Sequence, residues 1–365
     1  MLEKGVISQG QFIILAVLYI IGTSILIGPP LFVAAAKQNA WIGIIIGISF
    51  GFLHAYMYGI LAKRFPDKTL IEFNESILGK WVGKAVSFLF FIFFLVLTSG
   101  LLRIIGDFIT TNILTDTPIE AIEITFMLLL ILAVRLGLEP FSRTAEMVAP
   151  WVLIFFFLLT FCLLPQVEIS NLFPVLEDGM KPIVKASIFS LGVPFSDLVI
   201  FLMIAPHVST SKKIGKALFI ATFTGGFILL TIVLLSILVL GSNSIIQMNY
   251  PFFILAQKIN IGNFIQRIEV LAGGIVFIST FIKSTISFYS TVISFAHIFQ
   301  LKRFDILTLP FGMIIIVLAT VMFPNTIYFN LFLSTTWVPL AVSFGLFIPL
   351  ILLMIDTIKV KLRKN

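Results

Sequence analysis

The stretch Gly22-Thr23-Ser24-Ile25-Leu26-Ile27-Gly28-Pro29-Pro30 lies in the middle of the first long apolar segment of this chain. A helix that crosses a bilayer keeps its backbone hydrogen bonds unbroken, because lipid offers no replacement partners. Two glycines, two prolines and two hydroxyl residues predict an interruption of the helix here. Irregular backbone at membrane depth is tolerated where protein or a wet cavity surrounds it. The stretch therefore predicts the floor of a binding site within a membrane protein.

The composition excludes a soluble globular domain. The chain has 365 residues, of which 59% are hydrophobic and 11% charged, and its mean hydropathy is +1.14. A net charge of +7 is attributed to lysines and arginines on the cytoplasmic side of a membrane protein, not to nucleic-acid binding. No metal-ligand cluster, phosphate-binding glycine loop or catalytic triad spacing is present. We therefore predict a protein of the lipid bilayer that is not an enzyme and carries no cofactor or metal.

Hydropathy predicts ten membrane spans in one transmembrane domain over residues 1–365. They cover about 9–36, 41–62, 84–111, 119–136, 144–164, 183–206, 215–240, 265–299, 306–323 and 335–358. With a cytoplasmic N-terminus, 17 lysines and arginines fall in cytoplasmic segments, 5 in external segments and 2 within spans. This asymmetry predicts that both termini are cytoplasmic.

A second interruption lies in the sixth span, at Ser190-Leu191-Gly192-Val193-Pro194-Phe195-Ser196-Asp197. Glycine and proline at mid-span disrupt the helical hydrogen bonds. The sixth span enters from outside and the first from inside, so the two breaks lie in oppositely oriented helices. Breaks at matching positions of two halves indicate a transporter-type site between inverted repeats. The predicted repeats cover about 9–164 and 183–358.

Two short helices support the repeat. Thr69 and Glu72 form a T-x-x-E capping box, and the following apolar residues predict a helix over 69–78 on the cytoplasmic face. Tyr250 to Gly262 predicts a short external helix, with Pro251 in its first turn. The 69–78 helix is either an interfacial helix or a structured part of a gate.

Arg103, Asp107 and Lys283 are among the charged side chains that lie within predicted spans. Arg103 and Asp107 are one helical turn apart, so each lowers the cost of the other in the membrane. This pair is either a structural tie or a ligand site. Lys283 lies about 17 residues from either end of the eighth span and needs a partner or a wet cavity. We interpret it as a buried functional lysine, with snorkelling toward the membrane surface as the alternative.

Several short motifs resemble, in joint order, the B subunits of spore germinant receptors. They are 23–30, Ala40-Trp41, Pro66-Asp67, 70–73, 78–83, 116–119 and 171–179. That family belongs to the amino acid–polyamine–organocation superfamily, so the resemblance implies the LeuT-like fold of two inverted five-helix repeats. It also implies a multi-pass protein of the bacterial cell or spore inner membrane that recognises a nutrient germinant together with A and C subunits.

The two breaks predict where a small nutrient binds. The residues expected to form the site are Gly22, Thr23, Ser24, Gly28, Ser190, Leu191, Gly192, Phe195 and Asp197. The carboxylate of an L-amino acid would meet free N–H groups near Gly22 to Gly28, and its ammonium would meet carbonyls near Ser190 to Gly192. Asp197 either binds the ligand or complements a helix dipole.

The LeuT-like fold implies a role for Lys283. Transporters of that fold often hold sodium between the first and eighth helices, and the Lys283 ammonium would replace it by bonding to carbonyls near Thr23. Two other functions stay open at this point: a proton-coupled amino-acid permease that transports its substrate, and a structural scaffold of a membrane assembly.

Overall fold

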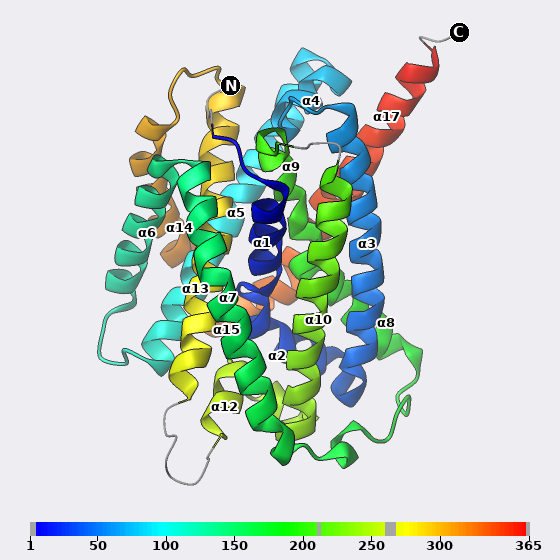
Figure 1. The fold of residues 1–365 in the computed structure, drawn as a ribbon, viewed down its shortest axis with the longest axis vertical. Helices are drawn as coiled ribbons and strands as arrows, with labels where there is room; N and C mark the ends of the chain where they lie inside the picture. The colour runs from blue at the N-terminus through cyan, green and yellow to red at the C-terminus, as the bar shows by residue number, and fades with distance from the viewer. Residues whose placement is uncertain (1–4, 210–212, 260–267, 363–365) are drawn as a thin grey trace.

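The computed structural model describes residues 5–209, 213–259 and 268–362 as a bundle composed mostly of helices (Figure 1). Eight helical stretches among these residues are long and apolar enough to cross a membrane. α6 (Ile119–Leu136) is not one of these eight stretches. Its 18 residues are long enough for a span, but it carries the charged residues Glu120, Glu123 and Arg135. The predicted helical membrane fold is confirmed, and the number of crossings stays a prediction.

The first apolar segment is two helices, as the sequence predicts. α1 (Gln9–Ile21) begins at a capping box formed by Ser8 and Gln11, and α2 (Ser24–Ala36) follows after Gly22 and Thr23. The break is narrower than the predicted stretch, because Pro29 and Pro30 lie within α2. Since proline lacks only its own N–H, neighbouring protein can compensate for the lost bond within a membrane helix.

The sixth predicted span is also interrupted. α8 (Met180–Ser190) leads into a π-helical turn, η4 (Leu191–Phe195), in which Val193 has extended backbone angles (φ −131°, ψ 112°). The chain then continues through η5 (Ser196–Ile200), α9 (Phe201–Ile204) and η6 (Ala205–His207). Backbone bonds from Ile7 N to His207 O and from Ser209 N to Ile7 O tie this end to the start of α1.

Unbroken helices surround these two. They are α3 (Ala40–Arg64), α5 (Lys80–Asn112), α6, α7 (Leu138–Leu163), α10 (Ile214–Leu240), α13 (Glu269–Ile298) and α14 (Thr308–Met322), with a short α11 (Ser242–Ile246) after α10. The predicted eighth span began at 265, which lies outside the described residues. α13 packs along α5, and α10 packs along α3 and α1.

The last span begins earlier than predicted. α15 (Thr326–Phe332) precedes the expected start at 335, and η9 (Leu333–Trp337), α16 (Val338–Val342), η10 (Ser343–Phe347) and α17 (Ile348–Leu362) continue it. Polar residues lower the hydropathy of the segment before residue 335, so the sequence did not indicate a span there. Their hydroxyls bond within the helix, however: Ser334 donates to Asn330 O and Thr335 to Leu331 O. Such bonds let Ser and Thr continue a helix.

The two predicted short helices lie at opposite ends of the bundle. α4 (Leu70–Leu78) has the predicted capping box, with Thr69 N donating to Glu72 Oε2 at 2.8 Å, and it lies at the same end as the end of α17 (Figure 1). α12 (Pro251–Gln257) lies at the other end. The predicted end of this helix, at 260–262, lies outside the described residues.

Glycines bring neighbouring helices against the second break. A Cβ at Gly43 would lie 2.7 Å from the Ala186 side chain, and one at Gly47 would overlap Ser190. Gly345 lies directly against the backbone of Ser196. The glycines of α3 therefore let it pack closely against α8, as small residues do between membrane helices. These contacts fix where the interrupted segment sits.

Candidate functional site

The two helix breaks face one cavity near the middle of the bundle. It has about 370 Å³ of unfilled space, including any part open to solvent. Its lining comprises Thr23, Ile27, Val96, Leu97, Gly100, Leu101, Ile104, Val193, Asp197, Lys283, Phe323, Phe329, Phe332, Leu333 and Trp337. We call it the central cavity. Apolar and aromatic side chains form most of its wall, and Asp197 and Lys283 are the charged residues among the described lining.

Lys283 and Asp197 form a buried ion pair. Lys283 Nζ lies 3.6 Å from Asp197 Oδ2, and each side chain is 1% exposed. The ammonium also lies 4.9 Å from the centre of the Tyr19 ring, a distance at which cations are attracted to aromatic faces. Because breaking a buried pair leaves an uncompensated charge, each member of this pair holds the other in place.

Gly22 makes room for the lysine. A Cβ at Gly22 would lie 2.7 Å from Lys283 Cδ and 3.0 Å from Tyr19 O. The lysine stem on α13 therefore packs directly against the first break. The described residues differ from the expectation in one respect, because the recorded partner of the ammonium is Asp197 and not a carbonyl near Thr23.

The start of α2 presents free donors near this pair. Thr23 O accepts from Leu26 N at 3.0 Å and from Ile27 N at 3.1 Å, and no side chain caps the helix. The first N–H groups of a helix have no partner within it, and they carry partial positive charge. Nearby, Asp197 Oδ1 and the buried Ser24 and Ser196 hydroxyls have no hydrogen-bond partner among the described residues. This region therefore has spare hydrogen-bonding capacity.

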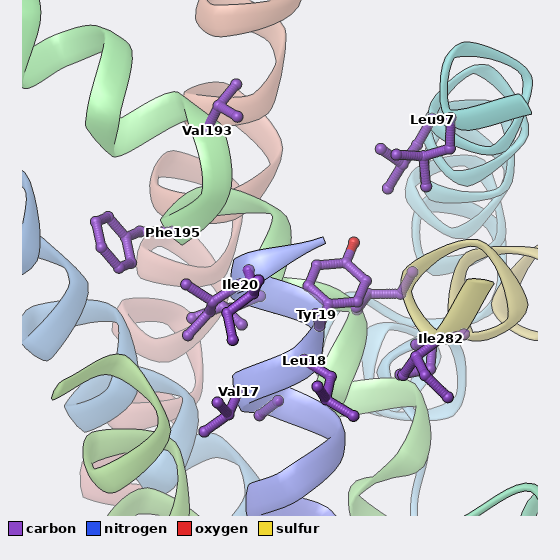
Figure 2. Close-up of a cluster of buried hydrophobic side chains, with 14 of the residues drawn as sticks. Val17, Leu18, Tyr19, Ile20, Leu97, Val193, Phe195 and Ile282 are labelled. Carbon is purple, nitrogen blue, oxygen red and sulfur yellow. The ribbon is translucent and has the colours of Figure 1, made fainter. Parts of the chain in front are cut away.

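Figure 2 shows the end of α1, with side chains of α5 and α13 on one side of it and side chains of the second break on the other. The Tyr19 ring points toward the side where Leu97 of α5 and Ile282 of α13 lie. Val193 and Phe195 of the second break lie on the opposite side. Tyr19, Ile282 and Phe195 are each at most 1% exposed, so packed side chains hold the two breaks in register.

The structure brings three of the predicted site residues, Thr23, Asp197 and Lys283, into the lining. Gly22 does not line the cavity but packs against the Lys283 side chain. Gly28 instead faces the Phe32 ring, 2.8 Å from the position of its missing Cβ. Ser24 is fully buried and lies next to Thr23 in the chain, outside the lining.

The other predicted residues of the second break pack against neighbouring helices. Ser190 lies against Gly47, and Gly192 lies against Val338, whose Cγ1 is 2.8 Å from the position of a glycine Cβ. Phe195 lies against Gly51, and Leu191 is buried outside the lining. They shape the interruption without lining the central cavity.

Sequence reasoning missed two walls of the cavity. One is the face of α5 that carries Leu97, Gly100 and Ile104, and the other runs from Phe323 to Trp337. Gly100 could have indicated the first of these walls, because it stands among large apolar residues of α5. A Cβ at Gly100 would meet nothing closer than the Phe329 ring at 3.6 Å. The second wall was missed because the final span was predicted to begin at 335.

Arg103 and Asp107 belong to a separate buried cluster. Arg103 Nε lies 3.4 Å from Asp107 Oδ1, and Arg103 Nη1 lies 3.7 Å from Oε1 of Glu123, which is fully buried on α6. Thr326 donates to Asp107 Oδ2 at 3.3 Å. Neither Arg103 nor Asp107 lines the central cavity. The cluster joins α5, α6 and the start of α15.

Within the described ranges, no three His, Cys, Asp or Glu side chains come together in a way that could hold a metal ion. The cation in the central cavity is the Lys283 ammonium itself. A Lys–Asp pair, helix N–H groups without a partner in the helix, and apolar walls together suit a small molecule that carries both charges and a modest apolar part.

The fold is similar to that of two solved transporters. Mhp1, a nucleobase-cation-symport-1 family transporter, matches with a TM-score of 0.70 and 14% identity over 93% of this chain and 76% of that chain. MhsT, solved in complex with L-phenylalanine, matches with a TM-score of 0.60 and 14% identity over 97% of this chain and 99% of that chain. Both have the LeuT fold, which confirms the predicted fold class.

Sequence comparison gives relatives over the whole chain. Spore germination protein KB of Bacillus subtilis (strain 168) is 28% identical over 100% of this chain and 98% of that protein. Spore germination protein YndE of the same organism is 25% identical over 81% of this chain and 82% of that protein. A family profile described as "Spore germination protein" matches residues 6–328. This chain therefore belongs to the spore germination protein family of permease-like membrane proteins.

Proposed function

We propose that this chain is the nutrient-binding subunit of a spore germination receptor. The central cavity is the observation that carries the proposal: a Lys–Asp pair and a helix N-terminus lie at one end of a pocket with apolar walls. A germination protein with a transporter fold can bind a nutrient in such a pocket, and this function needs no catalytic group. Binding of the nutrient would shift the population of receptor conformations toward the one that triggers germination.

The ligand chemistry follows from the charges in the cavity. A free L-amino acid carries one carboxylate and one ammonium, and the cavity offers one cation and one anion. The carboxylate would meet Lys283 and the free N–H groups at the start of α2, and the ammonium would meet Asp197. This assigns the ammonium to Asp197 rather than to backbone carbonyls near Ser190, because Asp197 Oδ1 has no hydrogen-bond partner among the described residues.

The walls limit the size and polarity of the ligand. Phe323, Phe329 and Trp337 approach the space from one side and Leu97 and Ile104 from another. Only about 30 Å³ of this space is free for the centre of a water molecule, so a small nutrient with an aliphatic side chain would enter only when these walls move apart. A bulky aromatic amino acid would have to displace these rings.

A germination assay tests the proposal. Spores whose receptor contains this chain would be exposed to single L-amino acids, and germination would be followed by loss of optical density. We expect a response to at least one small aliphatic amino acid, and its loss in Gly100→Leu, which extends a side chain into the central cavity without unpairing a buried charge. A response to sugars or nucleosides alone would contradict the assignment of an amino acid. Partner A and C subunits, expressed from the same strain, complete the proposed receptor in the spore inner membrane.

A proton-coupled amino-acid permease is the second candidate, because the fold is similar to that of transporters. Both candidates use the same cavity, so the difference is whether the ligand crosses the membrane. Uptake of a radiolabelled amino acid by proteoliposomes separates them. Accumulation driven by a proton gradient supports the permease, and saturable binding without accumulation supports the receptor.

A further inference from the structure

A second pocket lies next to the central cavity and shares two wall residues with it. Ile27 of α2 and Leu333 at the start of η9 line both spaces. Ile27 is 7% and Leu333 5% exposed, so both are buried apolar side chains that contact the two spaces. We call the second space the outer pocket, because α2, α8, α11 and α15 surround it in the half of the bundle predicted to be external. Its unfilled space is about 750 Å³, including the part open to solvent.

The outer pocket is more polar than the central cavity and carries a cation. Asn330, Ser334 and Lys185 line it, and Lys185 is the charged residue among its described lining. None of the ion pairs formed by the described residues includes Lys185. Its Nζ lies 5.6 Å from the centre of the Phe189 ring. A cation without a carboxylate partner, beside a pocket with polar groups, attracts anionic groups of dissolved molecules.

We propose that the outer pocket is a first binding station for solutes that carry a carboxylate, and that Ile27 and Leu333 form the barrier between it and the central cavity. A solute would be held by its carboxylate at Lys185 and would pass inward when the two side chains move apart. On this route the solute would next meet Lys283, the cation of the central cavity. The inference deepens the proposed function by assigning the access route to the same site, and its test needs no knowledge of the germinant.

Thiol modification tests both parts. Cys162 is the single cysteine of the chain, so Cys162→Ser gives a background without thiols. Ser334→Cys then places a thiol in the outer pocket, and Gly100→Cys places one in the central cavity, where a Cβ has at least 3.6 Å of clearance. The purified full-length chain is treated with an anionic sulfonatoethyl or a cationic trimethylammonioethyl methanethiosulfonate, and each rate is measured. Ser170→Cys, at an exposed residue of the short 3-10 helix η3 (Ile169–Leu172), is the reference position.

For the binding station, we expect the anionic reagent to react faster than the cationic one at Ser334→Cys, relative to Ser170→Cys. Lys185→Gln should lower that preference about threefold, a size typical of one charge near a protein surface. The preference at Ser170→Cys should not change. An equal preference with and without Lys185, or a Ser334→Cys thiol that does not react, would overturn this part.

For the barrier, Leu333→Ala should increase the modification rate at Gly100→Cys several-fold. Leu331→Ala is the matched control, because Leu331 is the same residue type two positions away and is 57% exposed. Ile27→Ala opens the other side of the barrier and provides a second variant if Leu333→Ala fails to fold. Equal rates in the two leucine variants and in Ile27→Ala would overturn the barrier. Since no amino acid is used, a failed search for germinants leaves these results intact.

Discussion

The Lys283–Asp197 pair gives the sharpest energetic prediction. The two groups are 3.6 Å apart and 1% exposed, so removing either charge leaves the other almost fully buried without its partner. Leaving one member of a buried ion pair costs about 3–5 kcal/mol. We expect that loss for Lys283→Met and for Asp197→Asn, which remove charge with little change of volume.

The double variant separates charge from packing. Lys283→Met with Asp197→Asn contains no buried charge at this site, so its stability should return to within about 1–2 kcal/mol of the original chain. Such non-additivity is expected for two groups in contact. Lys185→Met, which removes an exposed lysine on α8, is the control and should change stability by no more than about 0.5 kcal/mol.

Thermal unfolding in mild detergent, followed by circular dichroism, measures these effects. With the unfolding entropy per residue of soluble proteins, 3–5 kcal/mol lowers the melting temperature by about 4–7 °C in a chain of 365 residues. Single variants that melt within 1 °C of the original chain, or a double variant whose loss is the sum of the two single losses, would refute the reasoning.

Three further predictions use other parts of the structure. Gly22→Ala should destabilise the chain by about 1–3 kcal/mol, as overpacking does, because its Cβ would lie 2.7 Å from Lys283 Cδ; Gly100→Ala, measured beside it, should be neutral or more stable by up to about 1 kcal/mol. Arg103→Met should cost about 3–5 kcal/mol, because two buried carboxylates lose their cation; partial recovery in the double variant with Glu123→Gln, which leaves Asp107 charged, checks the cause, and a fully stable single variant would argue against it. Nutrient binding should persist when sodium chloride is replaced by choline chloride, because the Lys283 ammonium supplies the cation between the first and eighth spans; a calorimetric titration that needs sodium would contradict this.

The two breaks could be predicted because their residues are unusual at membrane depth. Glycine, proline and hydroxyl residues stand out in an apolar segment, and they identified the interruptions around Thr23 and Val193. The exact place of the first break could not be predicted. It lies at Gly22 and Thr23, where the Lys283 stem packs against the missing Cβ of Gly22, a contact between residues far apart in the chain.

The apolar walls of the cavity could not be predicted for a different reason. Leu97 and Ile104 belong to the same residue types that face lipid elsewhere on the bundle, and hydropathy does not distinguish a cavity wall from a lipid contact. The sequence also did not show which residue pairs with Lys283. Asp197 was recognised as a candidate, but its distance from Lys283 depends on how α3 and the last span pack against the second break.

Binding of L-amino acids to the purified chain and to Gly100→Leu tests the central claim most directly. A leucine at Gly100 grows into the central cavity, since nothing lies within 3.6 Å of its Cβ position. Gly274→Leu, where nothing lies within 4 Å, is the matched control. We predict that at least one small aliphatic amino acid binds the original chain and Gly274→Leu and does not bind a folded Gly100→Leu. Equal binding by all three proteins would contradict the placement of the nutrient between the two breaks.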